Sequence, residues 1–137
     1  MFGPVSEGMR IFHKKGSVAI VGYSDKPQRI VTKITQFLID QGNPVIGINP
    51  RLAHEENNPI AVHASLKDLN EPVEIIQIFR NSTALPAIGE EILNLSWRPK
   101  LVWCQQGVVD FLFQRRLEKK GILVVMDACP YALRSFL

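Results

Sequence analysis

Hydrophobic residues in this chain form short continuous runs, separated by longer stretches in which they recur every three or four positions. The runs are rich in valine and isoleucine: SVAIVG (17–22), PVIGIN (44–49), VEIIQIF (73–79), KLVWCQ (100–105) and ILVVMD (122–127). Strands that are buried on both faces carry runs of this kind. The pattern therefore predicts a mainly parallel sheet of five strands.

The stretches between the runs have the period of helices. Three helices are expected, over residues 27–41, 82–95 and 108–120, each with an apolar stripe that faces the sheet. In the third helix this stripe is expected to comprise Val109, Leu112, Phe113 and Leu117. A strand and helix rhythm repeated along the chain predicts a doubly wound α/β fold with helices on both faces of the sheet.

Two parts of the chain fall outside this rhythm. Residues 1–15 are expected to form an N-terminal arm or a short helix. The polar connection between the second and third runs is expected to hold a short strand near Ala61–Val62 and a helical turn at Leu66–Leu69. With no repeat and no linker in the sequence, residues 1–137 are interpreted as a single domain.

Composition narrows the class of protein. Apolar residues make up 46% of the 137 residues, but no stretch approaches the roughly 20 apolar residues of a membrane span. A net charge of +3 is too mild to indicate a nucleic-acid surface. The two cysteines, Cys104 and Cys129, do not suggest a disulfide framework, and the histidines share no metal-ligand spacing with them. We expect a protein of the reducing cytoplasm, with no metal site.

Polar and cationic residues follow the predicted strands at their carboxyl ends, where open parallel sheets bind ligands. The successive clusters are Gly22-Tyr23-Ser24-Asp25-Lys26, Asn49-Pro50-Arg51, Phe79-Arg80-Asn81, Gln105-Gln106-Gly107 and Asp127-Ala128-Cys129-Pro130. Glycine, asparagine and proline also occur in loops for purely conformational reasons. The clusters therefore indicate a ligand-binding rim without establishing one.

The first cluster has the features of an anion site. Gly22 permits close approach of the backbone, the following helix start favours negative charge, and Ser24 and Lys26 add a hydroxyl and an ammonium group. An NAD site would require an acidic residue after the second strand, whereas this strand ends in Asn49 and is followed by Arg51. An arginine there suits a ribose that carries a phosphate, as in NADP or coenzyme A (CoA).

Five segments together resemble a known family. VAIVGYSDKPQR, PVIGINPR, SLKDLNEPVEIIQIFR, KLVWCQQGV and GILVVMDACP occur in the order and at the spacing of the single-domain CoA-binding proteins. This Rossmann-like family is similar to the CoA-binding domain of the succinyl-CoA synthetase alpha subunit. The sequence departs from many members in two places: it lacks an arginine-proline-serine run at the first helix, and it has Ala128 before Cys129.

The resemblance implies where CoA would lie. It puts the CoA phosphates near Gly22, Tyr23, Ser24 and Lys26, and the adenosine near Asn49, Pro50 and Arg51. It also implies that Phe79 and Arg80 border the adenine or the pantetheine arm, and that Gln106 and Gly107 line the path of that arm.

The expected function is therefore binding of CoA or an acyl-CoA without catalysis, because no nucleophile, metal or acid-base constellation is visible. Two alternatives stay open: an NADP-binding oxidoreductase fragment, and a degenerate Rossmann scaffold that acts through protein contacts. A protein partner or a homo-oligomer is compatible with each. Cys129 is interpreted as a half-buried strand-end residue, although a redox role near the CoA thiol also stays open.

Overall fold

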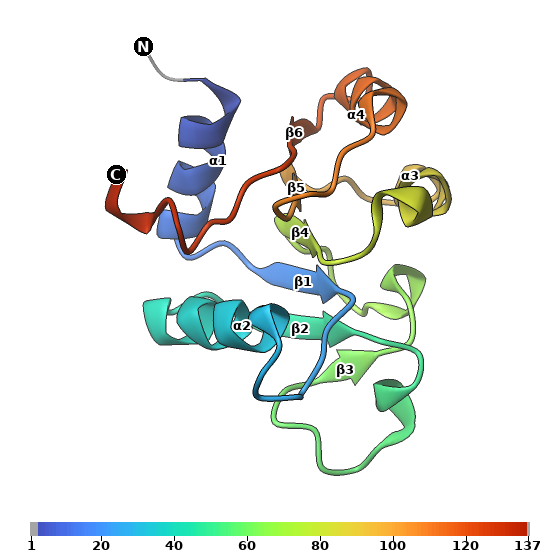
Figure 1. The fold of residues 1–137 in the computed structure, drawn as a ribbon. Coiled ribbons are helices and arrows are strands. Elements are labelled where there is room, and N and C mark those ends of the chain that lie inside the picture. Colours follow the sequence, from blue (N-terminus) through green and yellow to red (C-terminus); the bar gives the residue numbers. More distant parts are fainter. Residues whose placement is uncertain (1–2, 137) are drawn as a thin grey trace.

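The computed structural model describes residues 3–136, in which six parallel strands form one sheet (Figure 1). The strands are β1 (Val18–Val21), β2 (Val45–Ile48), β3 (Val62–His63), β4 (Ile75–Ile78), β5 (Leu101–Cys104) and β6 (Leu123–Val125). Their spatial order is β3-β2-β1-β4-β5-β6. The chain winds outward from β1 in both directions, so the strand order reverses between β1 and β4, where the carboxyl ends of the strands leave a crevice.

Four helices, with their residue ranges, cover the two faces of this sheet in the described chain: α1 (Pro4–His13), α2 (Ile30–Gln41), α3 (Leu85–Leu93) and α4 (Phe111–Glu118). Figure 1 shows α1 and α2 on one face and α3 and α4 on the other. Alternate residues of the central strands point to each face, so there are two apolar cores. Ile75 belongs to the core under α1 and α2, and Ile76 to the core under α3 and α4.

The predicted doubly wound parallel α/β fold is confirmed, with six strands rather than five. The additional strand is β3, at the edge of the sheet, where Val62 and His63 pair with Gly47 and Ile48. The sequence analysis expected this short strand, one residue earlier, near Ala61–Val62, but did not count it among the five strands of the sheet. The N-terminal segment forms α1, whose Phe12 ring packs edge-on against Trp103 with centroids 5.5 Å apart.

Each helix is shorter than its hydrophobic pattern indicated. The first begins at Ile30 rather than at residue 27. The second begins as a 3₁₀ turn, Ser82–Ala84, and becomes α-helical only at Leu85, because Pro86 lacks the N–H that would bond back to Ser82. The third begins after Asp110, whose carboxylate accepts a hydrogen bond from the Phe113 N–H at 3.0 Å.

The later start of α4 changes which of its residues face the sheet. Phe113 and Leu117 are buried as expected, but Leu112 is 64% exposed. Its neighbour Phe111 is 74% exposed. The expectation that Leu112 packs against the sheet was therefore wrong.

Candidate functional site

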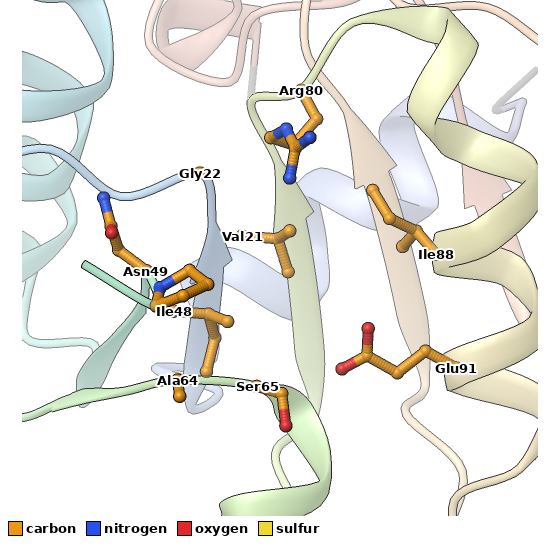
Figure 2. Close-up of a pocket in the computed structure, with 10 residues that line it drawn as sticks. Val21, Gly22, Ile48, Asn49, Ala64, Ser65, Arg80, Ile88 and Glu91 are labelled. Atoms are coloured by element: carbon orange, nitrogen blue, oxygen red, sulfur yellow. The ribbon is translucent and has the colours of Figure 1, made fainter. Parts of the chain in front are cut away.

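Two pockets lie side by side where the strand order reverses, and both are lined by Gly22 and Arg80. The first, here called the β2 pocket, has a volume of about 440 Å³. It is lined by Val21, Gly22, Ile48, Asn49, Pro50, Ala64, Ser65, Arg80, Ile88 and Glu91 (Figure 2). The second, here called the α2 pocket, has a volume of about 380 Å³. It is lined by Gly22, Ser24, Arg29, Ile30, Val31, Phe79, Arg80, Asn81, Gln105, Gln106 and Val108.

Gly22 lies between the two pockets in a conformation that other residues rarely adopt. Its φ is +86°, and a Cβ at this position would lie 2.7 Å from the carbonyl oxygen of Phe79. The space beside the Gly22 Cα is thus filled by the backbone of Phe79, the residue directly after β4. The backbone amides of Gly22 and Tyr23 are also engaged, since both donate to the Ile48 carbonyl, at 3.2 and 3.3 Å.

The Tyr23 side chain does not line either pocket. It is 3% exposed and its ring lies over Gly47, where a Cβ would come within 2.7 Å of the ring. Burial raises the pKa of Tyr23, and the charge of Asp25 raises it further. Tyr23 therefore anchors the first turn on β2 and contributes to the site by fixing the backbone.

Asn49 joins the first turn to the loop after β2. Its amide nitrogen donates to the Tyr23 carbonyl at 2.8 Å. Its side-chain oxygen accepts hydrogen bonds from the backbone N–H groups of Arg51 and Leu52, at 2.8 and 3.1 Å. Asn49 lines the β2 pocket. Both the nitrogen and the oxygen of its amide group are hydrogen-bonded to backbone, and these bonds hold the two loops together.

The loop between Ser24 and α2 is held by hydrogen bonds from Thr32, a residue of the helix. The Thr32 hydroxyl lies 2.8 Å from the Ser24 carbonyl oxygen and 2.7 Å from that of Lys26. The Ser24 hydroxyl in turn accepts from the Lys26 N–H at 3.2 Å. Together these bonds hold the loop in a turn and delay the helix to Ile30.

The start of α2 provides two unpaired amides at the α2 pocket. Within the described residues, the N–H groups of Ile30 and Val31 have no hydrogen-bond partner, as is usual for the first residues of a helix. Both residues line the α2 pocket. In the glycine turn the amides of Gly22 and Tyr23 are engaged, but the Ser24 N–H, which also lines this pocket, has no partner among residues 3–136. A bound anion can therefore use the amides of Ser24, Ile30 and Val31.

Two guanidinium groups face the α2 pocket. Arg29 precedes the helix start, and Arg80 follows β4 with its aliphatic stem close to Gly22. Neither side chain makes a hydrogen bond or ion pair with another described residue. No carboxylate of the described residues lines this pocket, so the lining that they form carries two positive charges without a paired negative charge.

A pair of buried amide side chains lies under the α2 pocket. The Gln77 amide nitrogen in β4 donates to the side-chain oxygen of Gln105 at 3.1 Å. This bond fixes the orientation of Gln105, which lines the pocket, and leaves the amide nitrogen of Gln105 without a partner among the described residues. The side-chain oxygen of Gln77 is buried without a hydrogen-bond partner in the same part of the chain.

The loop after β5 is held by Asp127, which lies two residues beyond the end of the neighbouring strand β6. The Asp127 carboxylate accepts a hydrogen bond from the Gly107 N–H at 2.7 Å. Both residues have positive φ, 58° for Asp127 and +85° for Gly107. Aspartate tolerates this conformation better than most residues. By holding Gly107, the Asp127 carboxylate also helps to fix the backbone of the preceding residue, Gln106.

The structure brings most of the residues implied by the sequence to one rim. Those that line at least one pocket are Gly22, Ser24, Asn49, Pro50, Phe79, Arg80 and Gln106. Those that line neither pocket are Tyr23, Lys26, Arg51 and Gly107. Sequence reasoning missed Arg29, although the motif that contains it was recognised. It also missed Glu91, for which the sequence carries no signal beyond a glutamate on a helix.

Two other kinds of site have no candidate among the described residues. No helix between residues 3 and 136 is long and apolar enough to cross a membrane. In the same part of the chain, no group of three or more His, Cys, Asp or Glu side chains is placed to hold a metal ion.

Comparison with known proteins confirms the resemblance seen in the sequence. A Bacillus subtilis (strain 168) protein, uncharacterized protein YneT, is 32% identical over 124 residues, which are 90% of this chain and 89% of the relative. A solved Thermus thermophilus structure is 33% identical, covers 98% of each chain and superposes with a TM-score of 0.85. A hypothetical protein from Pyrococcus horikoshii OT3 superposes with a TM-score of 0.84 over 99% of this chain and 92% of that one.

The identity to the Pyrococcus protein is 22%, so that likeness concerns the fold alone. The sequence pattern of a family described as "CoA binding domain" matches residues 16–134, which include both pockets and every strand of the sheet. The chain therefore belongs to the CoA binding domain family.

Proposed function

We propose that this protein binds CoA or an acyl-CoA across the two pockets, and that it does so without catalysing a reaction. The observation that carries this proposal is the lining of the α2 pocket. Arg29, Arg80 and the unpaired amides at the start of α2 line it, and no carboxylate between residues 3 and 136 does so. Guanidinium groups and helix-start amides are the donors that proteins use for phosphate groups.

The adjoining β2 pocket supports a nucleotide rather than a free phosphate. Its walls include the apolar side chains of Val21, Ile48 and Ile88, and such walls suit the faces of a purine base. Gly22 and Arg80 belong to both pockets. A ligand whose diphosphate lies in the α2 pocket can thus extend its adenosine into the β2 pocket and its pantetheine arm towards Gln106.

Support for an acyl-CoA comes from a third pocket of about 610 Å³ along α2. It is lined by Ile30, Lys33, Ile34, Gln36, Phe37, Asp40 and Tyr131, and it shares Ile30 with the α2 pocket. Its mainly apolar lining suits an acyl chain that continues past the thiol end of CoA. When bound, CoA would supply a thiol that carries the acyl group, and the residues of this chain would hold and shield it.

The proposed cellular location is the reducing cytoplasm. Both cysteines, Cys104 and Cys129, are free thiols in the structure. Disulfides are rare in that compartment, and a small CoA-binding domain would meet its ligand there.

Calorimetric titration tests the proposal directly. The purified protein is titrated with CoA, an acyl-CoA, dephospho-CoA, NADP and NAD. We expect CoA or its acyl derivative to bind more tightly than either dinucleotide. Binding of NADP without binding of CoA would instead support the oxidoreductase alternative, and no binding of any of them would support a protein scaffold.

Variants then locate the ligand. A hydrogen bond to a charged group contributes about 1.5–3 kcal/mol, so Arg29→Gln and Arg80→Gln should each weaken CoA binding by about tenfold or more. Arg115→Gln, on the exposed side of α4 and outside both pockets, removes the same charge and should leave the affinity unchanged. Arg51→Gln should weaken binding of CoA but not of dephospho-CoA if Arg51 contacts the 3′-phosphate.

A further inference from the structure

Among the described residues, one carboxylate lines the β2 pocket, that of Glu91, which comes from α3 on the far side of the crevice. One of its oxygens, Oε1, accepts a hydrogen bond from the backbone N–H of Leu66 at 2.9 Å. The side chain is partly buried, and its carboxylate is directed into the pocket, towards the side where Ile48 and Ser65 lie (Figure 2). No ion pair is made to it by any described residue.

The bond to Leu66 fixes what Glu91 offers to a ligand. Oε1 already accepts the backbone amide, and Oε2 is the oxygen that has no partner among the described residues and is free to accept from a molecule in the pocket. An ionised carboxylate only accepts hydrogen bonds. A group placed against Oε2 must therefore be a donor, and a carbonyl oxygen there would be repelled.

The position of Glu91 indicates which part of a nucleotide it meets. In Figure 2, Gly22 and Arg80 lie at one end of the β2 pocket, where it adjoins the α2 pocket, and Glu91 and Ser65 lie at the other. In a nucleotide the diphosphate and the base are at opposite ends, with the ribose between them. If the diphosphate lies near Arg80, the end of the pocket at Glu91 is the end that the base reaches.

We infer that Glu91 selects the base of the bound nucleotide by accepting a hydrogen bond from an exocyclic amino group, as on the six position of adenine. The inference rests on the proposed function, because it requires a nucleotide in this pocket. It adds a specificity-determining residue outside the five motifs of the sequence. Leu66 acts with Glu91 as the group that orients its carboxylate.

The substitution Glu91→Gln tests this inference because its geometry is constrained. The Leu66 N–H still requires an acceptor, so the substituted side chain should turn its oxygen to Leu66 and its amino group to the pocket. The pocket would then present a donor in place of an acceptor. The expected result is a change in preference from a base with an amino group to a base with a carbonyl group.

The measurement compares the dissociation constants of ADP and IDP for the wild-type protein and the variant. We expect the wild type to prefer ADP by about tenfold, as for loss of one charged hydrogen bond, and Glu91→Gln to abolish or reverse this preference. Glu90→Gln is the matched control. Glu90 is the preceding residue on α3, pairs with Arg116 and lines neither pocket, so its substitution should leave the ADP to IDP ratio unchanged.

The outcomes separate the inference from the proposed function. If CoA and ADP bind and Glu91→Gln leaves the ADP to IDP ratio unchanged, the role of Glu91 is refuted while CoA binding stands. If neither CoA nor ADP binds to the wild type, both the role of Glu91 and the proposed CoA binding are refuted. Equal urea midpoints for Glu91→Gln and the wild type would show that an altered ratio does not come from loss of folding.

Discussion

Replacing Gly22 by alanine should destabilise the protein even when no ligand is present. The residue has a φ of +86°, a region that costs an L-residue about 1–2 kcal/mol. The added Cβ would also lie 2.7 Å from the oxygen and 3.1 Å from the carbon of the Phe79 carbonyl. These are backbone atoms of the adjacent chain segment, so they cannot move aside as a flexible side chain would.

The expected loss of stability combines these two effects. Overpacking of this kind typically costs about 1–3 kcal/mol, so the sum with the backbone conformation is about 2–5 kcal/mol. Gly121→Ala is the matched control, because Gly121 has a similar φ of +81° but no atom of the described residues lies within 4 Å of the added Cβ. It should lose only the backbone contribution of about 1–2 kcal/mol.

Urea unfolding followed by tryptophan fluorescence, to which the buried Trp103 contributes together with Trp97, measures both free energies of unfolding. Equal losses for Gly22→Ala and Gly121→Ala would refute the contact with Phe79 as the reason for glycine. A larger loss at Gly22 would mean that this substitution cannot by itself report on ligand contacts, and that the arginine variants are the appropriate test of binding.

Three further predictions concern residues that hold or adjoin the site. Thr32→Val removes the hydroxyl bonded to the loop before α2; it should cost about 1–2 kcal/mol and weaken CoA binding, while Thr32→Ser should retain both. Asp127→Ala should cost about 1–2 kcal/mol by leaving the Gly107 N–H without its acceptor, and Asp127→Asn should cost less, as urea midpoints will show. Burial raises the pKa of Cys104 to about 12, with a smaller effect from Asp110, so this thiol stays protonated at pH 8. A thiol reagent at pH 8 should label Cys129 alone in the folded protein, and rapid labelling of Cys104 before unfolding would contradict its burial.

The fold was predictable because its central strands are continuous apolar runs. Val18–Val21 and Ile75–Ile78 are almost wholly apolar and fully buried, and such segments have few alternatives to the interior of a parallel sheet. Helix starts were harder to predict, because they depend on hydrogen bonds between side chains and distant backbone. The Thr32 hydroxyl and Pro86 determine where two of the helices begin, and the spacing of hydrophobic residues gives no information about either effect.

The candidate site was predictable in its location but less so in its donors. Helix α2 begins three residues later than predicted, at Ile30. Arg29, and not the predicted Lys26, is therefore the cation before this helix that lines the pocket. The amides of Gly22 and Tyr23 are engaged by Ile48, which depends on the register of β1 against β2. Glu91 lies 25 residues from its partner Leu66, so only the folded chain brings it to the pocket.

The hydrogen bonds of Asn49, which join two loops, and of Thr32, which join α2 to the loop before it, also have a kinetic consequence. A rim that is already shaped before its ligand arrives needs little reorganisation on encounter. Association should therefore proceed in one step, at a rate set by diffusion and by the attraction between the two arginines and the anion. Raising the ionic strength should then slow association markedly, while the dissociation rate should change far less.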